Sequence, residues 1–193
     1  TGPWAGDVVS RQLGRNEAAT LRLVKGSHIV IDRLYEGDHA FILQNADRRI
    51  VFTIPYEGRF TLVGTTDVPY VGDPAKTAIT EDEVRYLCDV VNRYFAKAIT
   101  PADIIWNYSG VRPLFDEDGS ESASAISRDY VLELEDEGGK APLLNVFGGK
   151  ITTFRRLSEH ALQKLKPYFP GARGDWTKGA PLPGGDIADA NFE

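Results

Sequence analysis

The sequence has 193 residues, of which 42% are hydrophobic and 26% charged, and its formal net charge is −6. These values are typical of a folded globular protein, and the negative charge argues against non-specific nucleic-acid binding. The single cysteine excludes a disulfide within the chain, and the three histidines show no metal-ligand spacing. No apolar run reaches the roughly 18 residues that a membrane-spanning helix needs.

The first part of the chain alternates short β-rich runs with turn residues. Short strands with tight connections indicate an antiparallel sheet. The predicted strands are 21–31, interrupted at 25–27, then 40–44 and 49–54, joined by a hairpin turn at 45–48, and 60–65.

A helix is predicted to follow this sheet. Thr80 and Glu83 have the spacing of a capping box, in which each side chain bonds to the backbone N–H of the other. Apolar residues then recur at helical spacing, which predicts one buried face. They are Val84, Leu87, Cys88, Val91, Tyr94 and Phe95.

The second part of the chain has more strands, one further helix and a Pro/Gly-rich end. The helix has an apolar face that continues to Leu165. In chain order we expect a strand at 104–111, a polar loop at 116–124, strands at 129–134 and 143–147 around a turn at 136–139, a helix from 151, and a linker from 167.

The junction at 147–153 combines two glycines and a lysine between a strand and a helix. Such a junction leaves backbone N–H groups at a helix N-terminus with no Cβ to keep a ligand away. Lys150 adds a positive charge, so the junction suits an anionic or carbonyl-bearing ligand. The alternative is a tight strand-to-helix turn with a surface lysine.

Three further side chains are candidates for binding or chemistry. Arg112 follows a strand and precedes Pro113, which restricts its backbone to an extended conformation. Its guanidinium suits a phosphate or carboxylate, although a structural ion pair is the alternative. Arg128 precedes a predicted strand, where pairing with Asp129 is the alternative. His28 lies where a loop enters a strand, and a lone histidine there is more often structural.

Seven motifs stand in an order that resembles FAD-dependent glycerol-3-phosphate dehydrogenases of the bacterial respiratory type. The similarity runs from Thr1 to about Leu165 without a large gap. The motifs are Thr1–Trp4, Leu23–His28, Ile54–Tyr56, Gly64–Asp67, Tyr108–Leu114, Ser127–Tyr130 and Phe147–Arg155.

The resemblance implies an α+β fold. It consists of an antiparallel-sheet substrate domain with helices on one side, together with the C-terminal strands and helix of a discontinuous FAD-binding domain. The implied segments are 1–19 (end of an FAD-binding segment), 20–115 (substrate domain), 116–166 (last strands and helix of the FAD-binding domain) and 167–193 (linker towards a further C-terminal domain).

The resemblance also implies oxidation of sn-glycerol 3-phosphate to dihydroxyacetone phosphate, with hydride transfer to FAD and electrons passed to a quinone. The residues implied in catalysis are His28, Lys150 and Arg112. Those implied in substrate binding are Arg112, Arg128, His28 and Lys150. Those implied in FAD binding are Thr1, Gly2, Gly148, Gly149, Lys150, Ile151 and Thr152. The base that accepts the C2 hydroxyl proton stays open among His28, Lys150 and solvent.

The Gly-x-Gly-x-x-Gly fingerprint of dinucleotide binding does not occur in the sequence. We therefore expect an internal fragment of the enzyme, inactive alone and holding FAD weakly or not at all. The alternatives are another FAD-dependent amine or amino-acid oxidoreductase of the same fold, or, for the isolated chain, a non-catalytic binding module. The expected location is the cytoplasm, with the parent a candidate for the cytoplasmic face of the inner membrane. The oligomeric state and the electron acceptor stay open.

Overall fold

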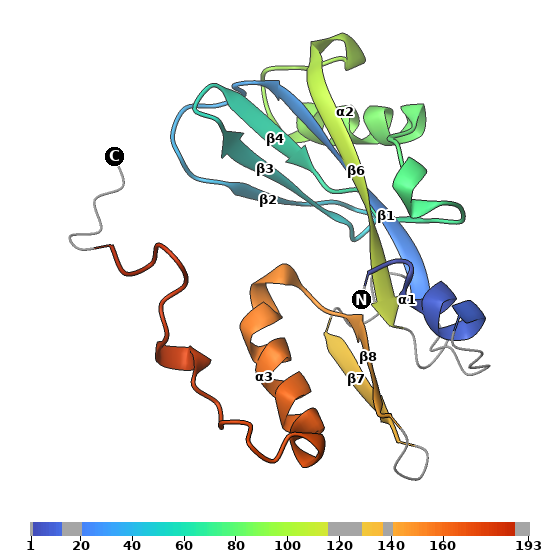
Figure 1. Cartoon of the computed structure of the whole chain (residues 1–193). Coiled ribbons are helices and arrows are strands. Elements are labelled where there is room, and N and C mark those ends of the chain that lie inside the picture. The colour runs from blue at the N-terminus through green and yellow to red at the C-terminus, as the bar shows by residue number, and fades with distance from the viewer. Residues whose placement is uncertain (1, 13–20, 116–128, 137–140, 188–193) are drawn as a thin grey trace. The chain divides into compact units, whose positions relative to one another are not determined.

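The computed structural model describes residues 2–12, 21–115, 129–136 and 141–187 (Figure 1). By its internal contacts the chain divides into two units, Gly2–Ser127 and Arg128–Glu193. The first unit begins with a single α-helical turn, α1 (Ala5–Asp7), which continues as a π-helical turn, Val8–Gln12.

The first unit is built on an antiparallel sheet around its long first strand. The strand order is β2-β3-β4-β1-β5, and β6 pairs with the other edge of β1 (Figure 1). Every pairing in this sheet is antiparallel. The strands are β1 (Leu21–Asp32), β2 (Phe41–Gln44), β3 (Ile50–Tyr56), β4 (Phe60–Gly64), β5 (Val68–Pro69) and β6 (Ile104–Phe115).

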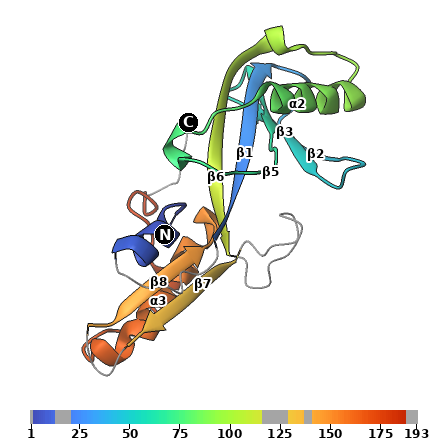
Figure 2. The same cartoon turned by 90° about the vertical axis from the view of Figure 1, so that its right-hand side faces the viewer.

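Helix α2 (Glu81–Tyr94) covers one face of this sheet and closes the core (Figure 2). It begins at the predicted capping box, with both reciprocal bonds between Thr80 and Glu83 present. Leu87 and Val91 are fully buried against Ile29 and Ile31 of β1 and their neighbours on β2, β3 and β4. The predicted helix is thus confirmed, and its apolar face is what holds the sheet and helix together.

Strand β1 is continuous through residues 25–27, so the predicted interruption there is wrong. Those residues pair with 109–111 of β6, and a partner strand along the whole length overrides the poor strand propensity of the local sequence. His28 therefore lies within a strand and not at its entry. Arg112 likewise lies inside β6, opposite Val24. Pro113 is tolerated because β6 pairs with β1 alone among the described strands, and an edge strand can lack a donor.

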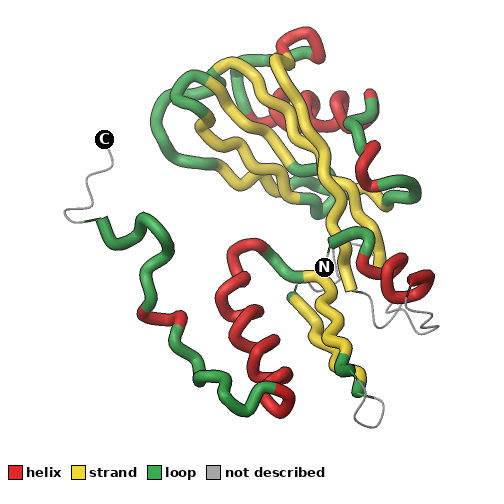
Figure 3. Tube along the Cα trace, viewed as in Figure 1, coloured by secondary structure: helices red, strands yellow, loops and turns green. Residues whose placement is uncertain are grey.

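The second unit contains a two-stranded antiparallel sheet and a helix (Figure 3). Strand β7 (Tyr130–Glu135) pairs with β8 (Leu143–Gly148), and a 3₁₀ turn, Ile151–Thr153, leads into α3 (Phe154–Leu165). These strands and the helix were predicted. Short 3₁₀ turns complete the two units at Pro74–Lys76, Pro101–Asp103, Lys166–Tyr168 and Thr177–Gly179.

The α+β class is confirmed, with antiparallel sheets and a helix on one side of the larger one. The predicted loop at 116–124 and most of the turn at 136–139 lie outside the described residues.

Candidate functional site

The Lys25–His28 motif lies on β1, where successive side chains point to opposite faces of the sheet. Lys25 and Ser27 point towards α2, where both contact Glu83. Gly26 and His28 therefore belong to the other face. Lys25 and Ser27 therefore lie on the face of the sheet that α2 covers, and Gly26 and His28 lie on the face that carries the candidate site.

Arg112 is held in place on this second face. Its Nη1 lies 2.9 Å from Asp67 Oδ1, and its Nη2 donates to Thr65 Oγ1 at 2.8 Å. The guanidinium lies over Gly26, because a Cβ at that residue would come within 2.4 Å of Nη2 and 2.5 Å of Nη1. Glycine at position 26 is therefore what allows the charged group to lie against the strand.

His28 lies one same-face position further along β1, between two neighbouring strands. Its ring stacks on that of Tyr108 in β6, with centroids 4.7 Å apart and planes within 5°. On the β4 side the ring lies against Gly64, where a Cβ would come within 2.1 Å of the histidine Cδ2. The packing fixes the orientation of the imidazole on both sides.

Two effects lower the pKa of His28 and so favour its neutral form. Burial first, and then the positive charge of Arg112, hold the pKa of His28 below its ordinary value of 6.5. Its Nδ1 is buried and has no hydrogen-bond partner within the described part of the chain. A neutral imidazole beside a fixed guanidinium can take up a proton from a ligand whose anionic group is bound by the arginine.

The second unit carries the glycine–lysine junction. Gly148 and Gly149 both have left-handed φ, at 67° and 91°, where other residues are strained. Lys150 is exposed, and Ile151, which opens the turn into α3, is 89% exposed. Because the first N–H groups of a helix lack partners within it, this junction presents donors and a positive charge together.

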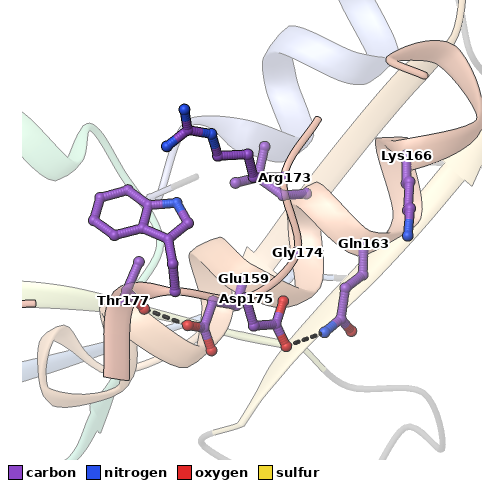
Figure 4. A pocket seen from close by; sticks show the side chains of 9 residues that line it. Glu159, Gln163, Lys166, Arg173, Gly174, Asp175 and Thr177 are labelled. Atoms are coloured by element: carbon purple, nitrogen blue, oxygen red, sulfur yellow. Dashed lines mark hydrogen bonds between the residues drawn. The ribbon is translucent and has the colours of Figure 1, made fainter. Parts of the chain in front are cut away.

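A hollow of about 280 Å³ lies beside α3 and contains none of the predicted site residues (Figure 4). Its polar groups bond to one another: Gln163 donates to Asp175 at 2.7 Å, and Thr177 donates to Glu159 (Figure 4). These bonds attach residues 175–177 to the helix. We interpret the hollow as a space left where α3 packs against the segment that follows it, and not as a binding site.

The structure thus brings His28 and Arg112 together within the first unit. It places Gly148, Gly149, Lys150, Ile151 and Thr152 at one junction of the second unit. Gly2 lies in the first unit with φ of 85°, and Thr1 and Arg128 lie outside the described residues.

No role was predicted from the sequence for the residues that hold Arg112 and His28. These are Gly26, Gly64, Thr65, Asp67 and Tyr108. A glycine inside a β-rich run is the signal that could have found Gly26 and Gly64, because it often marks a close approach of another group.

The described residues form neither a membrane-spanning helix nor a metal-binding cluster. None of their helices is long and apolar enough to cross a membrane. No group of three or more His, Cys, Asp or Glu side chains among them could hold a metal ion.

Comparison with known proteins identifies the family. Residues 1–155 match the model of the FAD dependent oxidoreductase family. The chain belongs to this family. FAD is therefore the cofactor of the family to which the chain belongs.

Two of the relatives are dehydrogenases named for polyol phosphates. The chain is 52% identical over 187 residues to the aerobic glycerol-3-phosphate dehydrogenase of Escherichia coli, covering 97% of this chain and 37% of that protein. It is 50% identical over 192 residues to the D-erythritol 1-phosphate dehydrogenase of Brucella abortus, covering 100% of this chain and 38% of that protein.

The chain also resembles a solved structure. The glycerol-3-phosphate dehydrogenase of Bacillus halodurans complexed with FAD superposes with a TM-score of 0.73 at 27% identity, over 92% of this chain and 33% of that one. The chain thus spans a little over a third of the length of the curated relatives and a third of the solved structure.

Proposed function

We propose that the full-length protein containing this chain oxidises sn-glycerol 3-phosphate to dihydroxyacetone phosphate, with FAD as hydride acceptor and a quinone as the final acceptor. The observation that supports this proposal most is that Arg112 and His28 lie together on one face of the sheet. One residue offers a fixed cation for a phosphate, and the other offers a neutral imidazole for a hydroxyl proton.

Arg112 binds the phosphate in this proposal. Its planar fork is already oriented by Thr65 and Asp67, so little conformational freedom is lost when the anion binds. Arg128 is proposed as a second phosphate ligand, on the resemblance alone. A site with two arginines disfavours free glycerol, because glycerol carries no anionic group for the two cations to bind.

His28 accepts the proton of the C2 hydroxyl as the C2 hydride leaves. Its lowered pKa supports this role, since the imidazole is unprotonated at neutral pH and can act as a base. Lys150 and solvent are the other candidates for the base, and Lys150 is proposed to contact the substrate oxygen as well as the cofactor.

The junction at the end of β8 fits the cofactor. FAD supplies the hydride acceptor, and its ring carries carbonyl groups that N–H donors can bind. Gly148, Gly149, Ile151 and Thr152 offer backbone donors there, and the left-handed glycines leave no Cβ in the way. Lys150 adds a positive charge that favours the reduced cofactor over the oxidised one. Thr1 and Gly2 are proposed as further cofactor contacts, on the resemblance alone.

D-erythritol 1-phosphate is a second candidate substrate. The Brucella abortus relative named for it matches this chain from end to end at 50% identity, close to the value for the glycerol-3-phosphate dehydrogenase. Both substrates carry the phosphate that Arg112 would bind, and they differ in the length of the polyol. An amine substrate is disfavoured, because it gives Arg112 no anionic group to bind. An amino-acid substrate is disfavoured because both relatives at this level of identity are named for phosphorylated polyols.

For the isolated chain, a non-catalytic binding module remains the alternative. For the full-length protein we propose a cytoplasmic location, on the inner face of the membrane that holds the quinone.

The test is to purify the full-length protein with FAD and measure electron transfer to a quinone analogue with each substrate. We expect turnover with sn-glycerol 3-phosphate and dihydroxyacetone phosphate as its product. A kcat/KM at least tenfold higher for D-erythritol 1-phosphate would select the second candidate. Turnover with an amino acid, and none with either phosphate, would refute both.

A further inference from the structure

Beneath the Arg112 site lies a buried carboxylate, Glu83, whose side chain is 4% exposed. Its Oε1 accepts hydrogen bonds from Ser27 Oγ at 2.9 Å and Thr66 Oγ1 at 2.7 Å. Its Oε2 lies 2.7 Å from Lys25 Nζ and accepts from the backbone N and the Oγ1 of Thr80 at 2.8 and 3.0 Å. One carboxylate at the start of α2 thus binds four residues from three segments.

Thr66 connects this carboxylate to the site. Its hydroxyl also accepts from the backbone N of Ser27 at 2.9 Å, and its own backbone N donates to the Ser27 carbonyl at 3.3 Å. Its two chain neighbours, Thr65 and Asp67, hold the Arg112 guanidinium. Any movement of Thr66 therefore moves both groups that orient the arginine.

Stability alone gives a poor account of this arrangement. Replacing a buried ion pair with apolar side chains of similar volume is often neutral or stabilising, because two charges must be desolvated. Burial works to raise the pKa of Glu83, but the hydrogen bonds from Lys25, Thr66, Thr80 and Ser27 outweigh it and lower the pKa to about 2. The carboxylate is therefore always ionised at neutral pH and holds its donors in one geometry.

We propose that Glu83 is a positioning residue for substrate binding, acting through Thr66 on the Thr65–Asp67 segment and so on Arg112. It contacts neither substrate nor cofactor. The proposal rests on the proposed function in one respect, namely that Arg112 binds the phosphate. The proposal also gives Lys25 and Ser27 a role in function, because they bind Glu83 on the buried face while Gly26 and His28 lie at the site on the other face.

The test is a double-mutant cycle on kcat/KM for sn-glycerol 3-phosphate in the full-length FAD-containing protein. Glu83→Gln is combined with Arg112→Ala, and Val90→Ala is the control, because Val90 is equally buried in α2 but belongs to the apolar core. We expect E83Q to lower kcat/KM about tenfold, mainly through KM, and to add nothing in the R112A background. V90A should lower the melting temperature while leaving kcat/KM within about twofold.

Two results would overturn the proposal, and they differ in what else they refute. If R112A is impaired and E83Q is harmless or its effect is simply additive, Glu83 does not act through Arg112, and the proposed function stands. If R112A has no effect, the phosphate assignment fails together with this inference. If E83Q does not fold, Thr66→Val breaks the same connection while leaving Glu83 its other partners, and the same expectations apply.

Discussion

Replacing Gly26 with alanine tests how the site is built, because it adds one methyl group beneath Arg112. The new Cβ would lie 2.4 Å from Nη2 and 2.5 Å from Nη1, whereas ordinary contacts begin at 3.4 Å. The guanidinium must therefore move by about 1 Å, which breaks its contacts at 2.8 Å to Thr65 and 2.9 Å to Asp67. A displacement of that size in a positioning group can cost about 100-fold in rate, or about 2.7 kcal/mol.

The assay is kcat/KM for sn-glycerol 3-phosphate in the full-length protein, with the FAD content of each variant measured alongside. Gly110→Ala is the matched control, because Gly110 faces Gly26 across β1 and β6 and its Cβ would meet no described atom within 4 Å. We expect G26A to lose about 100-fold and G110A to stay within about twofold. Equal losses in both variants, or full activity in G26A, would refute the account of how Arg112 is held.

Four further predictions concern single side chains. Arg112→Ala and Arg128→Ala should each cost about 2–4 kcal/mol in kcat/KM, measured by steady-state kinetics; wild-type values would make that arginine structural. Lys150→Ala should slow flavin reduction about 100- to 1,000-fold in rapid mixing while FAD is retained; normal reduction after reloading would make it a cofactor anchor. Because the pKa of His28 is lowered, kcat/KM should fall only below pH 6.5, where the imidazole becomes protonated, and this limb should vanish in His28→Asn. Because the pKa of Glu83 falls from 4.5 to about 2 on folding, about 3 kcal/mol of stability should be present above pH 4.5 and be lost as the pH falls towards 2, and denaturation of E83Q should lack this dependence.

Local signals in the sequence predicted the elements well where one segment decides its own structure. The capping box at Thr80 and Glu83, with apolar residues at helical spacing behind it, predicted α2. The two glycines before Lys150 predicted the junction between β8 and the turn into α3. Both depend on residues near one another in the chain.

The errors arose where distant segments decide the outcome. Residues 25–27 look like a strand break on their own, but β6, more than 80 positions away, supplies the hydrogen bonds that keep β1 continuous. The hydrogen-bond network around Glu83 was not predicted for the same reason. The local sequence predicts Glu83 only as part of a helix cap, because its contact with Ser27, 56 positions away, exists only in the folded sheet. Predicting His28 and Arg112 as site residues needed the resemblance, because each alone is more often structural.

The central claim is tested most directly by mixing the oxidised full-length protein with sn-glycerol 3-phosphate in the absence of oxygen and following the visible absorbance of its flavin. We expect rapid bleaching with sn-glycerol 3-phosphate and none with free glycerol, because glycerol carries no anionic group for Arg112 and Arg128 to bind. Bleaching by glycerol at a similar rate would contradict the phosphate assignment. Bleaching by an amine or amino acid, with the phosphorylated substrates inert, would contradict the proposed reaction itself.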